Sequence, residues 1–404
     1  MSTANAVLSP NEQTDTDRHF IGSITGINPG PTLFVIGSIH GNEPAGATAA
    51  RNIFPTLQKY QSSMAGEVIL LVGNTRGLSR GVRYIDADLN RLWTQENVAL
   101  LKAASHRHQT RSEESEVDEL LEHFERAAGR ATGEVYYLDL HTTSAHGLPF
   151  ATVGDTLRNR KFAMNFPTTI VLGLEEQIEG TMLEYVNNLG AVTMGFEAGQ
   201  HNAPSSVEHD EAVIWIAMIA AGLLRPEETP EFKRSLAILE NGSGGARIVE
   251  VRHRHAISPN DEFNMEPSFE NFQAVEHGQI LAQDRQGPIR AMESGMVLMP
   301  LYQKLGDDGF FLGRTVKPFW LKLSSLLRKL RVGDYVHLLP GVRRQGTDGR
   351  SFVVDTRIAR VLPLQVFHLL GFRKRRWSKN VLIVSRRRYD LAGPARPSPM
   401  ETKP

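Results

Sequence analysis

The alternation of strand-like and helix-like segments between residues 32 and 224 restricts the fold more than any other feature. Short apolar runs are separated by longer segments whose apolar residues recur at helical spacing. We predict strands at 33–37, 68–72, 135–140, 169–172 and 191–196, and helices at 181–189 and 205–224. This order predicts an α/β domain with a mainly parallel, mixed sheet and helices on both faces. In such a domain, ligands bind outside the carboxyl ends of the strands.

Two histidines and a glutamate occupy such strand ends. His40 and Glu43 lie in the turn between a predicted strand and a helical pattern, and His141 ends another predicted strand. Two imidazoles and one carboxylate are a ligand set of catalytic zinc, with a fourth position left for water. The chain contains no cysteine, so a metal must be held by His, Asp or Glu. We therefore expect one Zn²⁺ per chain on His40, Glu43 and His141, where it would activate a water molecule.

Further groups suited to hydrolysis follow other strands. Glu197 directly follows the strand at 191–196 and precedes the small residues Ala198 and Gly199, and it could act as a general base if burial raises its pKa. In the loop after the second strand, Arg83, Asn90 and Arg91 could bind an anionic substrate or a developing oxyanion. Asp88 could accept the free ring N–H of a zinc-bound histidine. The alternatives are an ordinary strand-end ion pair for Glu197 and a solvated loop for the others.

These stretches, in this order, resemble the succinylglutamate desuccinylase and aspartoacylase family of zinc carboxypeptidase-like amidohydrolases. The matching residues are His40-Gly41-Asn42-Glu43, Arg83 with Asp88-Leu89-Asn90-Arg91, Asp139-Leu140-His141, and Glu197 within Phe196-Glu197-Ala198-Gly199. The resemblance implies that His40, Glu43 and His141 bind zinc, that Glu197 is the general base, that Arg83 polarises the scissile carbonyl, and that Asn90 and Arg91 hold a substrate carboxylate. It extends more loosely over 247–317, which is similar to the family's β-rich C-terminal module at the active-site mouth.

Composition changes along the chain suggest five parts. We predict a flexible tail at 1–19, the catalytic domain at 20–226, a linker at 227–245, a β-rich module at 246–317 and a basic extension at 318–404 that begins with an amphipathic helix. From residue 320 onward there are 19 Lys and Arg against 5 Asp and Glu. This extension could bind nucleic acid or an anionic membrane, but we favour its docking onto the acidic remainder of its own chain.

The leading functional hypothesis is a zinc-dependent amidohydrolase that removes a small N-acyl group, of succinyl or acetyl type, from an anionic amino acid or a related small amide. The alternatives are a metallocarboxypeptidase acting on peptide C-termini and a polyanion-binding protein acting through the basic extension. Nucleotide cofactors are not expected, because the nucleophile-elbow, phosphate-loop and dinucleotide motifs are absent from the sequence. The N-terminus lacks an export-signal pattern, which favours a cytoplasmic location, and a homo-oligomer is possible.

Overall fold

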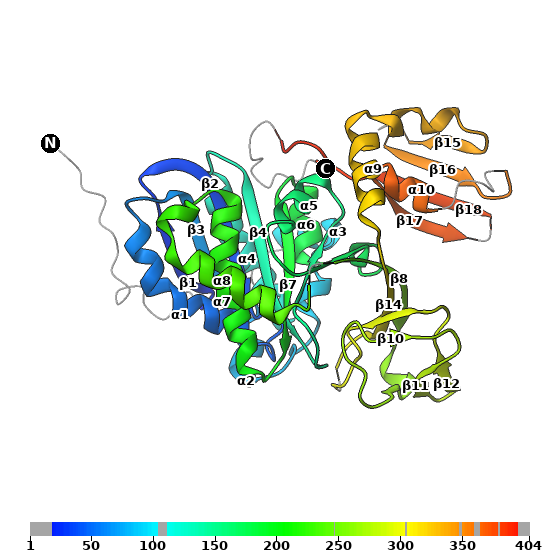
Figure 1. The fold of residues 1–404 in the computed structure, drawn as a ribbon, viewed down its shortest axis with the longest axis horizontal. Helices are drawn as coiled ribbons and strands as arrows, with labels where there is room; N and C mark the ends of the chain where they lie inside the picture. Colours follow the sequence, from blue (N-terminus) through cyan, green and yellow to red (C-terminus); the bar gives the residue numbers. More distant parts are fainter. Residues whose placement is uncertain are drawn as a thin grey trace.

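The computed structural model describes residues 18–103, 111–245, 247–303, 305–346, 350–358, 364–378 and 380–394. Most of the predicted tail at 1–19 lies outside these residues. Its last residue, His19, is 1% exposed and hydrogen-bonded to the Val72 carbonyl, so it belongs to the fold. The catalytic domain, the β-rich module and the extension follow one another along the chain, with the extension shown in orange and red (Figure 1).

A large mixed sheet forms the centre of the molecule. Its first seven strands along the chain are β1 (Phe20–Thr25), β2 (Asn28–Gly37), β3 (Ala65–Val72), β4 (Val135–Thr143), β5 (Phe150–Val153), β6 (Thr169–Leu172) and β7 (Val192–Gln200). Within the described residues, eleven strands share this sheet in the order β1-β3-β2-β4-β7-β5-β6-β8-β14-β13-β10. Strands β3, β2, β4 and β7 are parallel, whereas β1 and β5 run antiparallel to their neighbours β3 and β7. The predicted α/β class and mixed sheet are confirmed.

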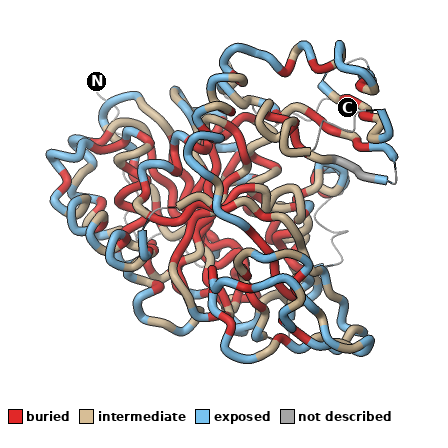
Figure 2. The backbone as a smooth tube through the Cα atoms, turned by 45° about the vertical axis from the view of Figure 1, so that its right-hand side comes forward, coloured by how far each residue is buried: buried red, intermediate tan, exposed pale blue. Residues whose placement is uncertain are grey.

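Both faces of the sheet are covered by helices because the central strands are apolar on both sides. In β2, Leu33 and Val35 pack into one core, while Phe34 and Ile36 pack into another. The first core includes residues of α1 (Ala45–Leu57), α5 (Leu157–Ala163), α7 (Pro204–Ala221) and α8 (Pro230–Gly242), and the second includes residues of α3 (Gln95–Ala103), α4 (Ser112–Ala128) and α6 (Met182–Asn188). Figure 2 shows the buried backbone concentrated between these layers. The short helix α2 (Thr75–Arg80) follows β3.

The predicted linker at 227–245 is wrong over most of its length. Residues Pro230–Gly242 form helix α8, which packs against α7. Leu239 is fully buried, and Phe232 and Leu236 pack on the same core. Their spacing is helical, and Pro230 occupies the first turn, where its missing N–H costs no intrahelical hydrogen bond.

The β-rich region is continuous with the central sheet. Strand β8 (Ile248–Ala256) pairs with β6 in parallel, and β14 (Asp308–Thr315), β13 (Gly295–Leu298) and β10 (Ala274–Val275) extend the sheet beyond it. A separate small sheet contains β9 (Asn264–Met265), β11 (Ile280–Asp284) and β12 (Gly287–Arg290). The β-rich region is therefore joined to the catalytic domain through the shared sheet.

The extension is a folded unit. Helix α9 (Pro318–Lys329) confirms the predicted amphipathic helix. It is followed by β15 (Val342–Gln345), β16 (Ser351–Asp355), α10 (Leu364–Leu369), β17 (Phe372–Ser378) and β18 (Val381–Arg386). Strands β15, β16, β18 and β17 form an antiparallel sheet. Phe352, Phe367 and Phe372 are at the centre of its own apolar core. None of the helices in the described part of the chain combines the length and hydropathy required to cross a lipid bilayer.

Candidate metal centre and active-site cavity

His40, Glu43 and His141 converge at the carboxyl ends of β2 and β4. Glu43 lies between the two rings: its Oε1 is 2.9 Å from His40 Nδ1, and its Oε2 is 3.1 Å from His141 Nδ1. One ligand atom from each residue can be chosen such that all three lie within 4.8 Å of one another. The structure thus brings together the three residues predicted as metal ligands.

The turn that carries His40 and Glu43 depends on close backbone contacts. The Glu43 N–H donates to the His40 carbonyl at 3.1 Å, and Ser38 Oγ donates to the Glu43 carbonyl at 2.9 Å. Gly41 donates its N–H to the Arg83 carbonyl, and a Cβ at Gly41 would lie 2.1 Å from the Gly77 carbonyl carbon. Only glycine fits at position 41, so the motif anchors the loop that carries Arg83.

Each histidine is oriented by a second carboxylate. His40 Nε2 lies 3.2 Å from Asp88, the residue predicted for this role. His141 Nε2 lies 2.9 Å from Asp139, two residues earlier on the same strand face, a contact that the sequence reasoning missed. His141 therefore has the arrangement of a metal-binding histidine, with Nε2 toward a carboxylate and Nδ1 toward Glu43. His40 Nδ1 also faces Glu43, and His40 Nε2 lies 2.8 Å from a terminal nitrogen of Arg83 as well as near Asp88.

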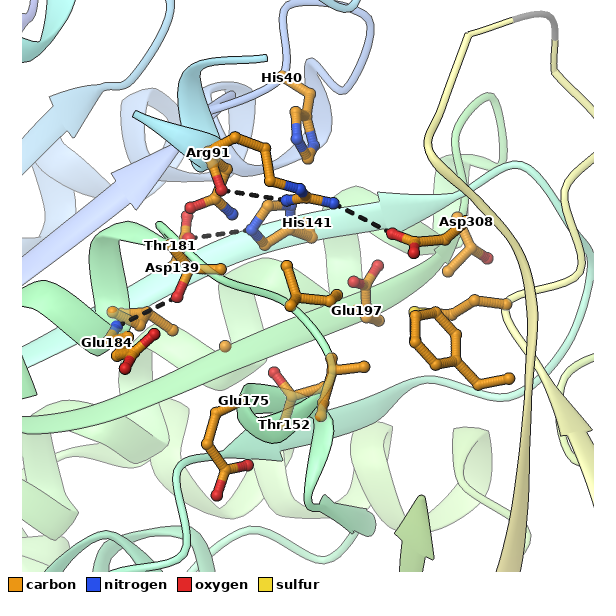
Figure 3. A pocket seen from close by; sticks show the side chains of 18 of the residues that line it. His40, Arg91, Asp139, His141, Thr152, Glu175, Thr181, Glu184, Glu197 and Asp308 are labelled. Carbon is orange, nitrogen blue, oxygen red and sulfur yellow. Dashed lines mark hydrogen bonds and ion pairs between the residues drawn. The ribbon is translucent and has the colours of Figure 1, made fainter. Parts of the chain in front are cut away.

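Glu197 lies beside His141 on the adjacent strand. The two residues are register partners between β4 and β7, and Figure 3 shows both in the same cavity. Burial raises the pKa of Glu197 to about 8; His141 opposes the rise, and Glu43 and Asp139 add to it. Glu197 Oε2 is buried and has no hydrogen-bond partner among the described residues. These properties suit a proton acceptor near neutral pH.

The predicted ends of these two strands were wrong. Strand β4 continues past His141 to Thr143, and β7 continues past Glu197 to Gln200. Thr143 pairs with Gln200, with a register shift after His141. The added residues extend the sheet beyond the metal centre and carry Thr142 into contact with His201.

Arg83 is held close to the metal centre. Its guanidinium donates to Asp88 Oδ2 from Nε at 3.2 Å and from a terminal nitrogen at 2.9 Å, and lies 3.6 Å from Glu43. Burial lowers the pKa of Arg83, but Asp88 and Glu43 more than offset this and raise it, so the side chain stays charged. It is a fixed cation beside the proposed ligands.

Asn90 and Arg91 already have partners within the protein. Asn90 Oδ1 accepts from the Met182 N–H at 2.9 Å, and Asn90 lines the cavity. Arg91 donates to Asp308 Oδ2 at 3.0 Å (Figure 3). Asp308 also pairs with Arg254. Asp308 comes from β14 and was missed in the sequence reasoning, because nothing local links it to Arg91.

His201 is a further residue that the sequence reasoning missed. Its Nδ1 lies 2.7 Å from Thr142 Oγ1, and its Nε2 lies 3.2 Å from Gln303 Oε1. Its position directly after β7 was a usable signal. Tyr302 is not among the residues that line the cavity, and its hydroxyl donates to the Glu266 carbonyl within the β-rich region. Phe311 does line the cavity.

A single cavity joins these residues. It encloses about 1450 Å³ of empty space, including the space open to solvent at its mouth. Its walls come from the catalytic domain, from the loop at 299–308 with Phe311, and from Arg373, Arg387 and Arg388 of the extension. The extension is therefore part of the cavity wall.

The catalytic region is similar to known proteins. Residues 29–222 match the sequence model of the Succinylglutamate desuccinylase/Aspartoacylase catalytic domain, and this match contains all eight predicted site residues. This stretch therefore matches the catalytic domain of the succinylglutamate desuccinylase/aspartoacylase family. The predicted resemblance is confirmed.

Two curated relatives and one solved structure illustrate the similarity. A succinylglutamate desuccinylase of Idiomarina loihiensis is 24% identical over 105 residues, which cover 26% of this chain and 29% of the relative. An N-acyl-aromatic-L-amino acid amidohydrolase (carboxylate-forming) of Xenopus tropicalis is 30% identical over 115 residues, covering 28% and 34%. The matches thus span about a third of these relatives. The crystal structure of a succinylglutamate desuccinylase/aspartoacylase from Rhodobacter sphaeroides superposes with a TM-score of 0.54 at 18% identity, covering 73% of this chain and 88% of that one, which establishes the shared fold.

Proposed function

We propose that this protein is a metal-dependent amidohydrolase that removes an N-acyl group from an amino acid or a related small amide. The observation that carries the proposal is the convergence of His40, Glu43 and His141, with the buried carboxylate of Glu197 on the adjacent strand. The match of the catalytic region to the family and the named activities of the two curated relatives support the reaction class.

The donor set fits a divalent metal ion, and we propose Zn²⁺, one per chain. His40 and His141 present Nδ1 atoms toward the same carboxylate, while Asp88 and Asp139 fix their opposite ring nitrogens. When bound, the ion would supply Lewis acidity and positive charge to the reaction centre.

Glu197 would carry the proton through the reaction. As the water oxygen bonds to the amide carbonyl carbon, Glu197 accepts a water proton, and it donates that proton to the nitrogen as the C–N bond breaks. Its raised pKa, about 8, suits both steps near neutral pH. Arg83 would donate to the carbonyl oxygen as negative charge develops there. Because Asp88 already holds the guanidinium in place, little reorganisation is needed.

A substrate carboxylate would bind at Asn90 and Arg91. The Asn90 side-chain NH₂ is a neutral donor, and Arg91 would exchange Asp308 for the substrate group. Asp308 would keep Arg254 as its partner, so the exchange leaves no unpaired carboxylate.

The test combines metal analysis with a substrate panel. The purified protein is expected to hold about one zinc per chain, and Glu43→Ala and His141→Ala are expected to lose it. N-acetyl and N-succinyl amino acids should be cleaved in preference to short unblocked peptides. Cleavage of the peptides alone would favour a metallocarboxypeptidase, and full metal content in both variants would contradict the proposed ligands.

We also propose that the basic extension docks onto its own chain instead of a polyanion. Ion pairs of Arg328 with Asp155, Arg373 with Glu184 and Arg387 with Glu176 support this proposal. Steeply salt-dependent binding to DNA or anionic vesicles would favour the alternative.

A further inference from the structure

The cavity continues beyond the catalytic end along one face of β7. Glu197, Gly195 and Thr193 alternate along this strand and all three line the cavity. A strand advances roughly 3.3 Å per residue, so Thr193 lies about 13 Å from Glu197 along the strand. An acetyl or succinyl group at the catalytic end is too short to occupy this length.

Gly195 keeps the middle of this passage open. A Cβ at position 195 would lie 2.5 Å from Thr152 Oγ1 and 3.4 Å from Leu183 Cδ1. Any side chain there would enter the space between β5 and α6, which Thr152, Leu183 and Asn187 also line. Figure 3 shows Thr152, Glu175 and Glu184 on the side of the cavity away from His40.

The far end of the passage is closed by the extension. Arg373 pairs with Glu184 at 2.5 Å, and Arg387 pairs with Glu175 at 2.6 Å and with Glu176 at 2.7 Å. These contacts fix the extension against the loop and helix that line the cavity.

Arg388 differs from the other two arginines. It lines the cavity, is exposed, and has no ion pair or side-chain hydrogen bond to another described residue. Glu184 pairs with Arg373, and Glu175 and Glu176 pair with Arg387, so Arg388 is the arginine at this end that has no carboxylate partner among the described residues.

We propose that the extension forms a distal subsite and that Arg388 binds a carboxylate at the far end of an extended substrate. This proposal rests on the proposed function. A guanidinium only donates, and its planar fork matches a carboxylate. Because the amino acid carboxylate is held at Asn90 and Arg91, the extended part is the acyl chain. The substrate class is thus N-acyl amino acids whose long acyl chain ends in a carboxylate.

The experiment compares matched N-acyl derivatives of one amino acid with the full-length, metal-loaded protein. N-suberoyl and N-nonanoyl substrates have similar length and differ at the chain end, and an N-acetyl substrate does not reach the extension. We expect kcat/KM to favour the suberoyl over the nonanoyl substrate by about tenfold, as for one hydrogen-bonded charge pair.

Variants of Arg388 test whether its side chain binds the terminal carboxylate of the acyl chain. Arg388→Ala should abolish the preference through a higher KM for the suberoyl substrate, and Arg388→Lys should retain part of it. Arg388→Glu should reverse it. The control is Arg343→Ala, an exposed arginine on β15 of the same unit that does not line the cavity, and it should keep the preference. Binding of free suberate, measured by calorimetry, should weaken in Arg388→Ala.

The outcomes separate this proposal from the proposed function. Cleavage of the acetyl substrate without a suberoyl preference would overturn the distal subsite alone, as would an unchanged preference in Arg388→Ala. Failure to cleave any N-acyl substrate would overturn the proposed function. In that case suberate binding still decides the subsite: equal affinity in the wild type and Arg388→Ala would contradict it.

Discussion

Glu197 is the residue on which the proposed proton transfers depend. Replacing it with Gln keeps the shape of the side chain and removes the proton acceptor. We expect Glu197→Gln to lower kcat by about 10²- to 10⁴-fold with little change in KM, because general base catalysis contributes on that scale. Steady-state kinetics measures the effect. Metal content per chain is the control, since an accompanying loss of metal would assign Glu197 to the metal site instead of the proton transfers.

Substitutions at Arg91 and Asp308 test whether Arg91 binds the substrate carboxylate. Arg91→Ala should raise KM for carboxylate-bearing substrates while kcat stays close to the wild-type value, as expected for loss of uniform binding. Asp308→Asn removes the charge that competes for Arg91 and should lower KM for the same substrates. Equal losses of kcat and kcat/KM in Arg91→Ala would place Arg91 in the chemical step instead.

The site residues that could be predicted are those that neighbouring residues in the sequence place at a strand end. His40, Glu43 and Glu197 each follow an apolar run directly, so the strand pattern alone places them at one edge of the sheet. Asp308 gave no such signal, because its contact with Arg91 depends on the pairing of β14 with β8. The pairing of Arg91 with Asp308 could not be predicted for that reason, and the role of Arg91 in binding a substrate carboxylate stays a prediction.

At the scale of elements, the packing of β7 against β5 and α6 sets the width of the cavity. Gly195→Ala would place a methyl group 2.5 Å from Thr152 Oγ1. We expect a loss of about 1–3 kcal/mol in the free energy of unfolding, the usual result of overpacking. Urea denaturation of the full chain measures this loss.

Thr152 supplies the matched control for that substitution. Thr152→Ala removes the Oγ1 atom, so the double variant Gly195→Ala/Thr152→Ala should recover part of the stability lost by Gly195→Ala. Strictly additive losses in the two single variants would show that the contact with Thr152 is not the cause.

The elements that were not predicted are either short or flanked by proline and glycine residues that are typical of loops. Strand β5 has four residues, antiparallel to β7 and parallel to β6, so no alternation was long enough to identify it. Helix α8 was mistaken for a linker because prolines precede it and Gly-rich residues follow it. Pro230 is instead the start of the helix, and Gly242 is its last residue.

At the scale of the whole molecule, the basic extension and the acidic catalytic domain are joined by buried ion pairs. Arg328 is 1% exposed and contacts Asp155 at 2.8 Å, and nearby arginines lower the pKa of the buried Asp155 carboxyl despite the opposing effect of burial. The charge asymmetry was visible in the sequence. The particular carboxylates were not, because they follow different strands and helices that only the fold brings together.

His368 makes this interface sensitive to pH. It lies in α10, with Nε2 3.0 Å from Glu176 and Nδ1 3.3 Å from Glu250. Burial lowers its pKa, but the hydrogen bonds to the two glutamates outweigh burial and raise the pKa to about 9 from the usual 6.5. The protonated ring therefore stabilises the folded state. This contribution, about 3 kcal/mol, is complete below about pH 6.5 and is lost as the pH rises through about 9.

The variant His368→Gln isolates this effect from that of His19, whose pKa is also raised to about 9, by Glu116 and Glu119 despite opposing burial. The wild type loses stability at alkaline pH through both histidines, whereas the variant retains only the His19 contribution. Urea denaturation curves should therefore show a wild-type advantage that is largest near pH 6 and disappears above about pH 9. A difference that does not change with pH would mean that His368 stabilises the interface by packing alone, and that the imidazolium charge plays no part in holding the extension over the cavity.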